Sequence, residues 1–262
     1  MISAQDQESL RSIAAKLAQA RRLLFITGAG ISAESGLPTY RGVGGLYSDS
    51  ATEDGMPIEE ALSAQMLAKR PALPWKYMSQ IERSCRGRKP NRAHEVIAAL
   101  EARGLDVWVL TQNVDGFHKQ AGSRQVIDIH GDVHFLYCTR AGCGWKDEVQ
   151  DYAHLGDALP PVCPKCRALV RPDVVLFGES LPVEKMLRLR EQRRRGFDAV
   201  FSVGTTSVFP YIAAPVWEAR EEGVPTIEIN PGQTEVSGVV DHRIQAGAAA
   251  ALDMLFGLLY PA

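Results

Sequence analysis

Five short apolar runs, each ending in a cluster of small or polar residues, constrain the fold of this chain more than any other feature. They cover residues 23–26, 107–110, 126–129, 200–203 and 226–229. Helical patterns separate several of them, for example residues 92–102 and 211–222. Strands that alternate with helices form parallel sheets covered on both faces. We therefore expect an α/β fold with a Rossmann-like parallel sheet.

The polar clusters that follow these runs are expected to meet at one place. Ligands of such sheets bind outside the carboxyl ends of the strands, and all five clusters fall at that edge. In chain order they are Gly28-Ala29-Gly30, Gln112-Asn113-Val114-Asp115, His130-Gly131-Asp132, Gly204-Thr205-Thr206-Ser207 and Asn230-Pro231-Gly232. The sequence thus predicts one binding site built from five separate segments.

Size and composition fit a globular enzyme in the cytoplasm. The chain has 262 residues, 45% of them hydrophobic, and a formal net charge of -2, so no global basic field favours nucleic acid. Leu10, Ile13, Ala14 and Leu17 recur at helical spacing, which predicts an amphipathic N-terminal helix rather than a signal peptide. No apolar run is long enough to cross a bilayer. We expect neither nucleic acid nor a membrane as a partner.

Two stretches interrupt the alternation and are expected to be insertions near the ligand edge. Residues 43–89 begin after a glycine-rich turn and continue with helical, proline-punctuated sequence, whereas residues 134–170 carry four of the five cysteines. The discontinuous remainder, residues 1–42, 90–133 and 171–262, would form the Rossmann-like domain. The dense charge run at residues 188–195 is typical of a solvated helix face.

The glycine loop at residues 28–33 fits the loose G-x-G-x-x-G/A pattern after a strand. Such glycines let the backbone approach a pyrophosphate, although a tight turn with no ligand also fits them. A dehydrogenase would carry an acidic residue about twenty positions further on, at the end of a second strand. This chain has Tyr47-Ser48-Asp49-Ser50 there, which is typical of a loop. The pattern favours a dinucleotide site without hydride transfer.

Four cysteines are paired in the spacing of a zinc site. Cys138-x4-Cys143 and Cys163-x2-Cys166 supply four thiolates for a tetrahedral ion, where scattered free thiols would leave the paired spacing unexplained. Four protein ligands leave no position for substrate, so the zinc is expected to be structural. A nucleic-acid-binding zinc ribbon is disfavoured because the segment lacks a basic and aromatic strip. Cys85 stands apart, and we expect a half-buried free thiol there.

Taken together, these motifs resemble those of the sirtuins, the NAD-dependent lysine deacylases. The matching segments are residues 28–41, 111–115, 130–131, the cysteine quartet, 171–179, 204–207 and 230–231, in family order. The resemblance covers about residues 20–250. It implies that the acyl oxygen of an acyl-lysine protein or peptide attacks the nicotinamide ribose, nicotinamide leaves, and the acyl group ends on ADP-ribose. We also expect a monomer.

The resemblance implies roles for individual residues. His130 would be the general base on a ribose hydroxyl, Asn113 would hold the ribose and a water, and Asp115 would accept from the nicotinamide amide. His130 as a core histidine, or Asn113 and Asp115 as helix caps, would be the ordinary structural explanations. The implied NAD set is Gly28, Ala29, Gly30, Ser32, Glu34, Pro38, Thr39, Tyr40, Arg41, Gln112, Asn113, Val114, Asp115, His130, Gly204, Thr205, Thr206, Ser207, Asn230, Pro231, Gly232 and Ala248.

The resemblance also implies how the peptide binds. Residues 175–179 would offer backbone groups to an extended peptide, with Val208 and Phe209 opposite and Phe177 walling a lysine tunnel. An ordinary buried strand at residues 174–177 is the alternative. The implied substrate set is Met78, Ile81, Val174, Val175, Phe177, Gly178, Glu179, Val208 and Phe209.

The acyl group is expected to be apolar. Relatives that prefer succinyl or malonyl lysine carry Tyr-x-x-Arg in the helical insertion, and this chain places Met78 and Ile81 there. Shifting the register by one gives Tyr77 and Gln80, still without an arginine. A buried carboxylate without a partner costs several kcal/mol, so acetyl and longer unbranched groups are expected substrates. If Met78 and Ile81 only pack a helix, acetyl alone would be accepted.

Two other classes of function share these features. Mono-ADP-ribosyl transfer or plain NAD hydrolysis would use the same cleft without deacylation. A non-catalytic NAD-binding or zinc interaction module would keep the fold and lack turnover. The apparent peptide segment and apolar acyl pocket favour deacylation.

Overall fold

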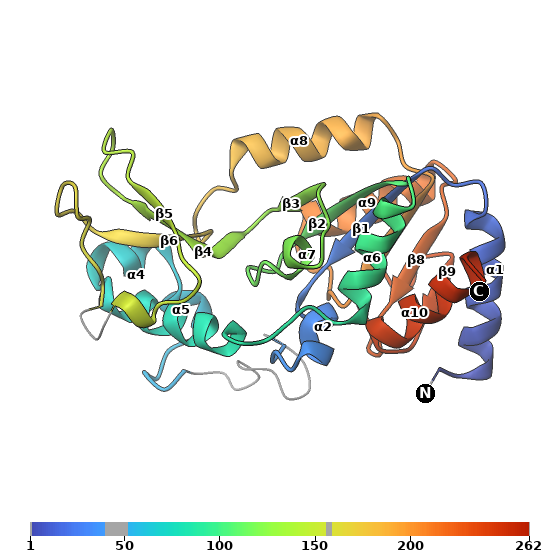
Figure 1. The fold of residues 1–262 in the computed structure, drawn as a ribbon, viewed down its shortest axis with the longest axis horizontal. Coiled ribbons are helices and arrows are strands. Elements are labelled where there is room, and N and C mark those ends of the chain that lie inside the picture. The colour runs from blue at the N-terminus through green and yellow to red at the C-terminus, as the bar shows by residue number, and fades with distance from the viewer. Residues whose placement is uncertain (1, 40–51, 156–158, 262) are drawn as a thin grey trace.

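The computed structural model describes residues 2–39, 52–155 and 159–261 of the 262-residue chain. Its larger unit is built on a six-stranded sheet (Figure 1). The strand order is β3-β2-β1-β7-β8-β9, and every neighbouring pair is parallel. The predicted Rossmann-like α/β class is confirmed. The strands are β1 (Arg22–Thr27), β2 (Asp106–Thr111), β3 (Val126–Asp128), β7 (Ala199–Val203), β8 (Thr226–Ile229) and β9 (His242–Ile244).

All five apolar runs lie in this sheet, whereas the edge strand β9 was not predicted. Of its three residues only Ile244 is buried. Such a short, half-exposed strand produces no apolar run in the sequence, because backbone pairing with β8 rather than side-chain burial defines it.

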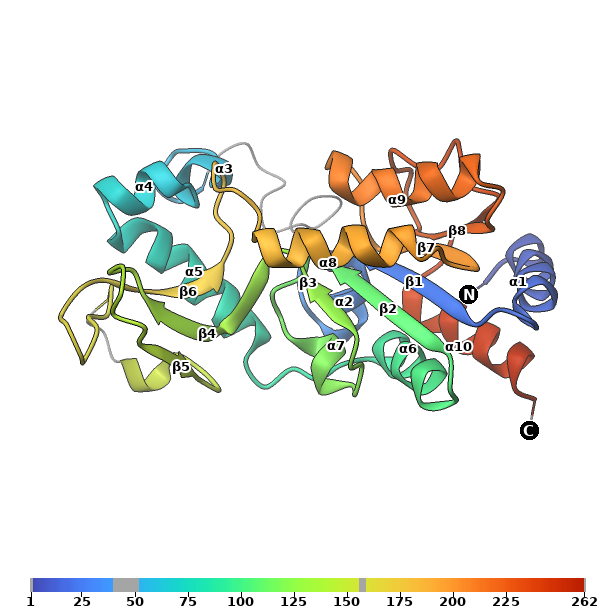
Figure 2. The same ribbon diagram turned by 90° about the horizontal axis from the view of Figure 1, so that it is seen from above.

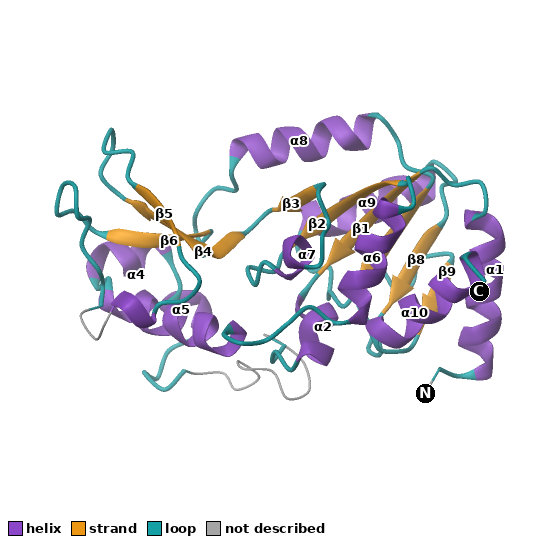
Figure 3. Cartoon of the chain, in the orientation of Figure 1, coloured by secondary structure: helices purple, strands orange, loops and turns teal. Residues whose placement is uncertain are grey.

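Alternate residues of the central strands supply two cores. Leu23 and Phe25 of β1 pack on one face, while Leu24 and Ile26 pack on the other. The first face is covered by α1 (Ala4–Leu17), α6 (Arg92–Ala102) and α10 (Ala248–Leu259). The second is covered by α8 (Val183–Arg194) and α9 (Pro210–Glu221), as Figures 2 and 3 show. Burial on both faces explains why these strands are continuous apolar runs.

Two helices behave as their sequences predict. In α1, the four apolar residues at helical spacing are buried, and the Ser3 hydroxyl accepts from the Asp6 N–H at the helix start. In α8, only Leu189 and Gln192 are buried, so the charge run is a solvated helix face, as predicted. No helix in the described ranges has the length and apolar character needed to span a bilayer.

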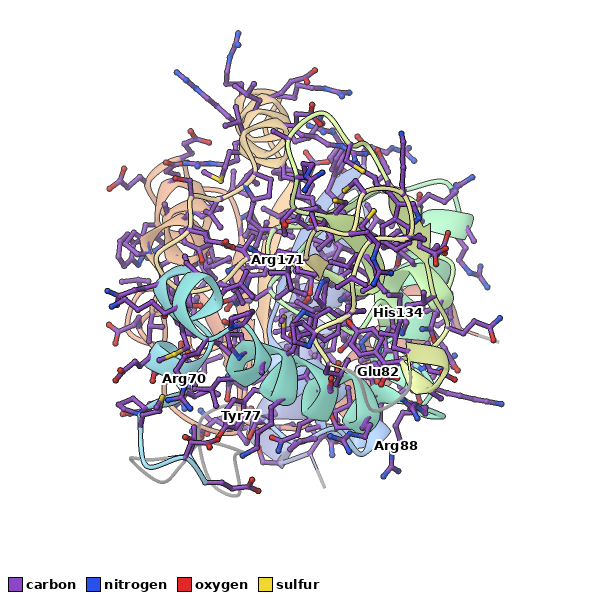
Figure 4. The ribbon with its side chains drawn as sticks, turned by 90° about the vertical axis from the view of Figure 1, so that its left-hand side faces the viewer. Arg70, Tyr77, Glu82, Arg88, His134 and Arg171 are labelled. Atoms are coloured by element: carbon purple, nitrogen blue, oxygen red, sulfur yellow. The ribbon has the colours of Figure 1, made fainter. Side chains whose placement is uncertain are left out.

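A second unit combines the two insertions. Its antiparallel sheet, in the order β5-β4-β6, consists of β4 (Gly131–Cys138), β5 (Lys146–Glu148) and β6 (Val170–Val174). Against it pack α3 (Ile58–Ala61), α4 (Ala64–Lys69) and α5 (Ala72–Cys85). Trp75 of α5 is fully buried, and its indole N–H donates to the Val170 carbonyl at 2.9 Å. Figure 4 views this end of the molecule, with Tyr77 and Glu82 on α5 and with His134 and Arg171 on the strands above.

Candidate functional site

All five strand-end clusters contribute to one cavity of about 990 Å³. Its wall contains at least one residue from each cluster, among them Gly28, Gln112, His130, Gly204 and Asn230. The opposite wall comes from the second unit and the segment that follows β6. The convergence expected from the sheet is therefore present, and both structural units contribute to the cavity.

Two glycine turns touch each other at the floor of this cavity. The Gly30 N–H donates to the Gly204 carbonyl at 2.8 Å, and a Cβ on Gly30 would lie 2.7 Å from the Gly204 Cα. Gly204 has a φ of +59°, and a Cβ there would meet the Ile31 nitrogen at 2.3 Å. These glycines are required for contact between two loops of the protein, irrespective of any ligand.

A chain of hydrogen bonds ties the β2 end to the glycine turn. The Asn113 side-chain amide donates to the Gly28 carbonyl at 3.1 Å and to the Ser32 hydroxyl at 3.2 Å. Ser32 in turn donates to the Asp115 carboxylate at 2.7 Å. Burial raises the pKa of the Asp115 carboxyl, although bonds from the Phe117 N–H and Ser32 oppose this. Asn113 is thus held in one orientation, with its neighbour Asp115 beneath the cavity.

A second chain of hydrogen bonds runs from β2 across the cavity floor to β8. The Gln112 side chain donates to the Thr205 hydroxyl at 2.7 Å. The Asn230 side chain donates to the Thr205 carbonyl at 3.1 Å. Three strand ends are therefore linked directly through polar side chains that line the cavity.

His130 lies between β3 and β4, with both ring nitrogens engaged. Nδ1 is 3.1 Å from the Gln112 carbonyl, which can only accept, so Nδ1 carries the proton. Nε2 of the neutral ring is then an acceptor, and the Tyr211 hydroxyl lies 2.6 Å from it. Burial lowers the pKa of His130; the Gln112 carbonyl opposes this, and Lys185 adds to it. The imidazole therefore lines the cavity with its proton on Nδ1 and its lone pair on Nε2.

Tyr211 was not predicted as a site residue. Its sequence position is the first residue of a predicted helix, residues 211–222, where a tyrosine by itself carries no chemical signal. The structure places it in the first turn of α9, on the cavity wall. Its position close behind the Gly204–Ser207 cluster is the signal that could have identified it.

Most side chains that line the end of the cavity formed by the second unit are apolar, although Glu59 and Glu179 also line it. Ile58, Leu62 and Ile81 line it from the helical insertion, and Leu176 and Leu181 line it from the segment after β6. Of these, Ile81 was predicted for the acyl pocket, and Leu176 lies within the predicted peptide segment, residues 175–179. The others sit on short helices and loops whose apolar residues have no recognisable period.

Internal bonds shape the segment after β6. Arg171 is buried and holds the Glu179 carboxylate with two bonds, of 2.5 and 3.0 Å. The Phe177 N–H donates to the Leu62 carbonyl, and its own carbonyl accepts from the Ala64 N–H. The backbone of Phe177 is thus committed to the helical insertion, while its side chain remains 39% exposed beside the cavity.

The remaining predicted residues divide into three groups. Most line the cavity. The second group does not line it: Ser32, Asp115, Ser207 and Met78 are buried, and Pro38 is half-buried. The third group, Tyr40 and Arg41, falls outside the described residues. Cavity-lining residues that were not predicted individually are Ala33, Ile58, Glu59, Leu62, Leu176, Leu181, Tyr211, Ile229, Gln233, Ala246 and Gly247.

The four paired cysteines form a compact cluster in the second unit. Their sulfur atoms all lie within 4.8 Å of one another, with Cys138 3.4 Å from Cys166 and Cys143 3.8 Å from Cys163. Tetrahedral zinc with bonds of about 2.3 Å requires sulfurs about 3.8 Å apart. The donor set and spacing fit one structural zinc ion.

Cys85 is not half-buried, as the sequence suggested. It is 7% exposed and packs with Leu37 and Phe117. Burial raises the pKa of its thiol to about 12. This cysteine belongs to the core because its helix, α5, turns that face toward the sheet domain.

A parallel sheet with a glycine-rich nucleotide turn, joined to a four-cysteine unit across a shared cavity, defines a class of zinc-containing nucleotide-binding α/β proteins. Within this class the match is specific: residues 28–210 match the Sir2 family. The chain belongs to the Sir2 family, which confirms the resemblance seen in the motifs.

Relatives and solved structures agree with this assignment. The chain is 47% identical to NAD-dependent protein deacylase 2 of Pseudomonas aeruginosa, covering 96% of this chain and 97% of the relative. It is 50% identical to the protein of the same name from Pseudomonas syringae pv. tomato, covering 90% of this chain and 94% of that relative. A crystal structure of a Sir2 homologue–NAD complex matches with a TM-score of 0.84, 33% identity and coverage of 95% and 93%. A Sir2–p53 peptide–NAD⁺ structure matches with a TM-score of 0.79 and 28% identity, covering 93% of this chain and 95% of that chain.

Removing one zinc ligand should release the metal. We expect Cys143→Ala to reduce bound zinc from about one per chain to nearly none and to lower the melting temperature by about 10 °C or more, because binding energy of the metal is folding energy of the unit. Cys85→Ala is the matched control and should keep its zinc. Elemental analysis with thermal denaturation measures both; full zinc content in Cys143→Ala would contradict the assignment.

Proposed function

We propose that this protein removes acyl groups from lysine side chains with consumption of NAD, releasing nicotinamide and O-acyl-ADP-ribose. The observation that carries this proposal is a neutral imidazole, His130, at the boundary between a polar and an apolar part of one cavity. The names of the relatives and the NAD complex of a Sir2 homologue support the activity.

The cavity divides according to the chemistry of the two substrates. The turns around Gly28, Thr205 and Asn230 offer backbone and amide groups to a dinucleotide, with Ala248 at the far end. Ile58, Leu62 and Ile81 offer hydrocarbon surface to an acyl-lysine. A reaction that joins an acyl group to a ribose requires both ends to meet, and His130 stands where they do.

In the proposed reaction His130 acts as a general base. The acyl oxygen attacks the anomeric carbon of the nicotinamide ribose, and nicotinamide departs with the bonding electrons. His130 Nε2 then accepts the proton of a ribose hydroxyl, so that the hydroxyl oxygen can attack the acyl carbon. Asn113 would orient the ribose. Ser32 and Asp115 would fix the orientation of the Asn113 amide, and Asp115 would also accept a hydrogen bond from the nicotinamide amide.

The protein substrate is proposed to bind across the cavity mouth. Phe177 and Val208 are exposed hydrophobic residues there, 39% and 44% accessible. The Sir2 structures with p53 peptides support a peptide or protein as substrate. Because the backbone of Phe177 pairs with the helical insertion and that of Leu176 bonds to Glu179, a peptide strand would use the remaining backbone groups of residues 175–179. The cytoplasmic location and monomeric state remain predictions.

ADP-ribosyl transfer and NAD hydrolysis use the polar end of the cavity alone. Neither accounts for an apolar end lined from the helical insertion, so the structure gives neither any support of its own. Labelled NAD incubated with an acyl-lysine peptide separates the reactions, because deacylation puts the label on O-acyl-ADP-ribose and transfer puts it on protein.

Replacing the proposed base should remove deacylation. We expect His130→Ala to reduce turnover by about 100-fold or more, because general base catalysis contributes on that order, while zinc content and melting temperature stay near wild type. His242→Ala is the matched control, since His242 lies on β9 outside the cavity wall. Formation of O-acetyl-ADP-ribose from an acetyl-lysine peptide measures the effect, because His130 acts after nicotinamide has left. Turnover within tenfold of wild type would refute the role of His130.

The pH dependence follows from the lowered pKa of His130. The base works only when neutral, so activity should be lost as the pH falls through a value below the ordinary histidine pKa of about 6.5. Measured as kcat/KM, which reports the free enzyme, the acid limb should lie below about pH 6.5. An acid limb centred above neutral pH would contradict this assignment.

The apolar end should select the acyl group. No arginine or lysine is among the described residues that line the cavity, whereas Glu34, Glu59 and Glu179 are. Acetyl and longer unbranched acyl-lysines should therefore be processed, and succinyl-lysine should have a kcat/KM about 100-fold lower, since its carboxylate would be buried without a partner. A series of peptides that differ only in the acyl group measures this. Faster removal of succinyl than of acetyl would overturn the prediction.

A further inference from the structure

The hydrogen bond between Tyr211 and His130 occupies the atom that the proposed reaction needs. Since Nδ1 of His130 donates to the Gln112 carbonyl, the one lone pair on the ring is at Nε2. The Tyr211 hydroxyl, 2.6 Å away, donates to that lone pair. Burial raises the pKa of Tyr211 to about 12, so this hydroxyl keeps its proton at neutral pH.

The aromatic surroundings hold this pair in place. The rings of Tyr211 and Phe209 stack with centroids 5.5 Å apart and an interplanar angle of 16°. Both rings contact the His130 imidazole edge-on, with ring centroids 6.0 Å apart in each case. The interplanar angle is 86° for Phe209 and 81° for Tyr211. The imidazole is thus fixed in orientation by ring contacts and in tautomer by hydrogen bonds at both nitrogens.

We propose that Tyr211 is a positioning residue that acts as a placeholder for the ribose hydroxyl. This inference rests on the proposed function. One lone pair cannot accept two hydrogen bonds in good geometry, so the ribose hydroxyl and the Tyr211 hydroxyl compete for Nε2. Tyr211 keeps the base in the reactive tautomer and facing the cavity before the dinucleotide arrives, and it gives up the bond when the ribose binds.

The competition has a measurable consequence. Ribose binding must break the Tyr211–His130 bond, and a hydrogen bond of this kind contributes an amount that corresponds to about two- to tenfold in affinity. Tyr211→Phe removes one oxygen atom and preserves the stack on Phe209. The variant should therefore bind ADP-ribose about two- to tenfold more tightly than wild type, and its KM for NAD should fall in the same direction.

A double-mutant cycle tests whether the effect passes through His130. Dissociation constants for ADP-ribose are measured by calorimetry for wild type, Tyr211→Phe, His130→Ala and the double variant. In the His130→Ala background the acceptor is gone, so Tyr211→Phe should change the affinity by less than twofold. Tyr260→Phe is the control, because Tyr260 packs on Phe256 and Arg103 outside the cavity wall.

Two results would overturn the inference. One is ADP-ribose binding by Tyr211→Phe that is unchanged or weaker than in wild type. The other is an equal gain in affinity with and without His130, which would show that the hydroxyl acts by bulk or packing. The proposed function fails separately, if His130→Ala retains full deacylation, and the affinity cycle still decides the role of Tyr211 in that case.

Discussion

The site depends on one hydrogen bond from the Gln112 side chain and one to its backbone carbonyl. Its side chain donates to Thr205 and so joins the ends of β2 and β7, while its backbone carbonyl accepts from His130. The second bond decides which nitrogen of the imidazole carries the proton. A residue at the end of a central strand is a rigid support for that purpose, because β2 is hydrogen-bonded on both sides, to β1 and β3. The chemistry at His130 is therefore set by the sheet itself.

The position of His130 also explains why the sheet domain carries a second unit. β3 ends at Asp128 and β4 begins at Gly131, so the histidine lies at the joint between the two sheets. Gly131, with a φ of +93°, lets β4 run so close to β6 that a Cβ would lie 1.8 Å from the Asp173 carbonyl. The cysteine cluster holds the far end of β4 through Cys138. A cysteine cluster outside the cavity thus holds one end of the strand whose other end begins beside His130.

The sequence was informative where local pattern and final structure coincide. Strands buried on both faces appear as apolar runs, and the topology of a parallel sheet brings their ends together, so the cavity floor from Gly28 to Asn230 could be predicted from the sequence. Contacts that depend on tertiary packing were not accessible. Tyr211 belongs to the site because it contacts an imidazole 81 residues away in the sequence. Leu62 lines the cavity beside the segment that follows β6. The two insertions form one unit because Trp75 is buried against β6.

The burial that keeps His130 neutral also determines the fate of the proton that this residue accepts. In the proposed reaction the imidazole ends the step as an imidazolium, a cation enclosed by Phe209, Tyr211 and the cavity wall. The same desolvation that lowers the pKa of the base makes this cation a stronger acid than free imidazolium. It therefore returns the proton readily to the departing lysine amine or to water, and the neutral base is restored without a further protein group.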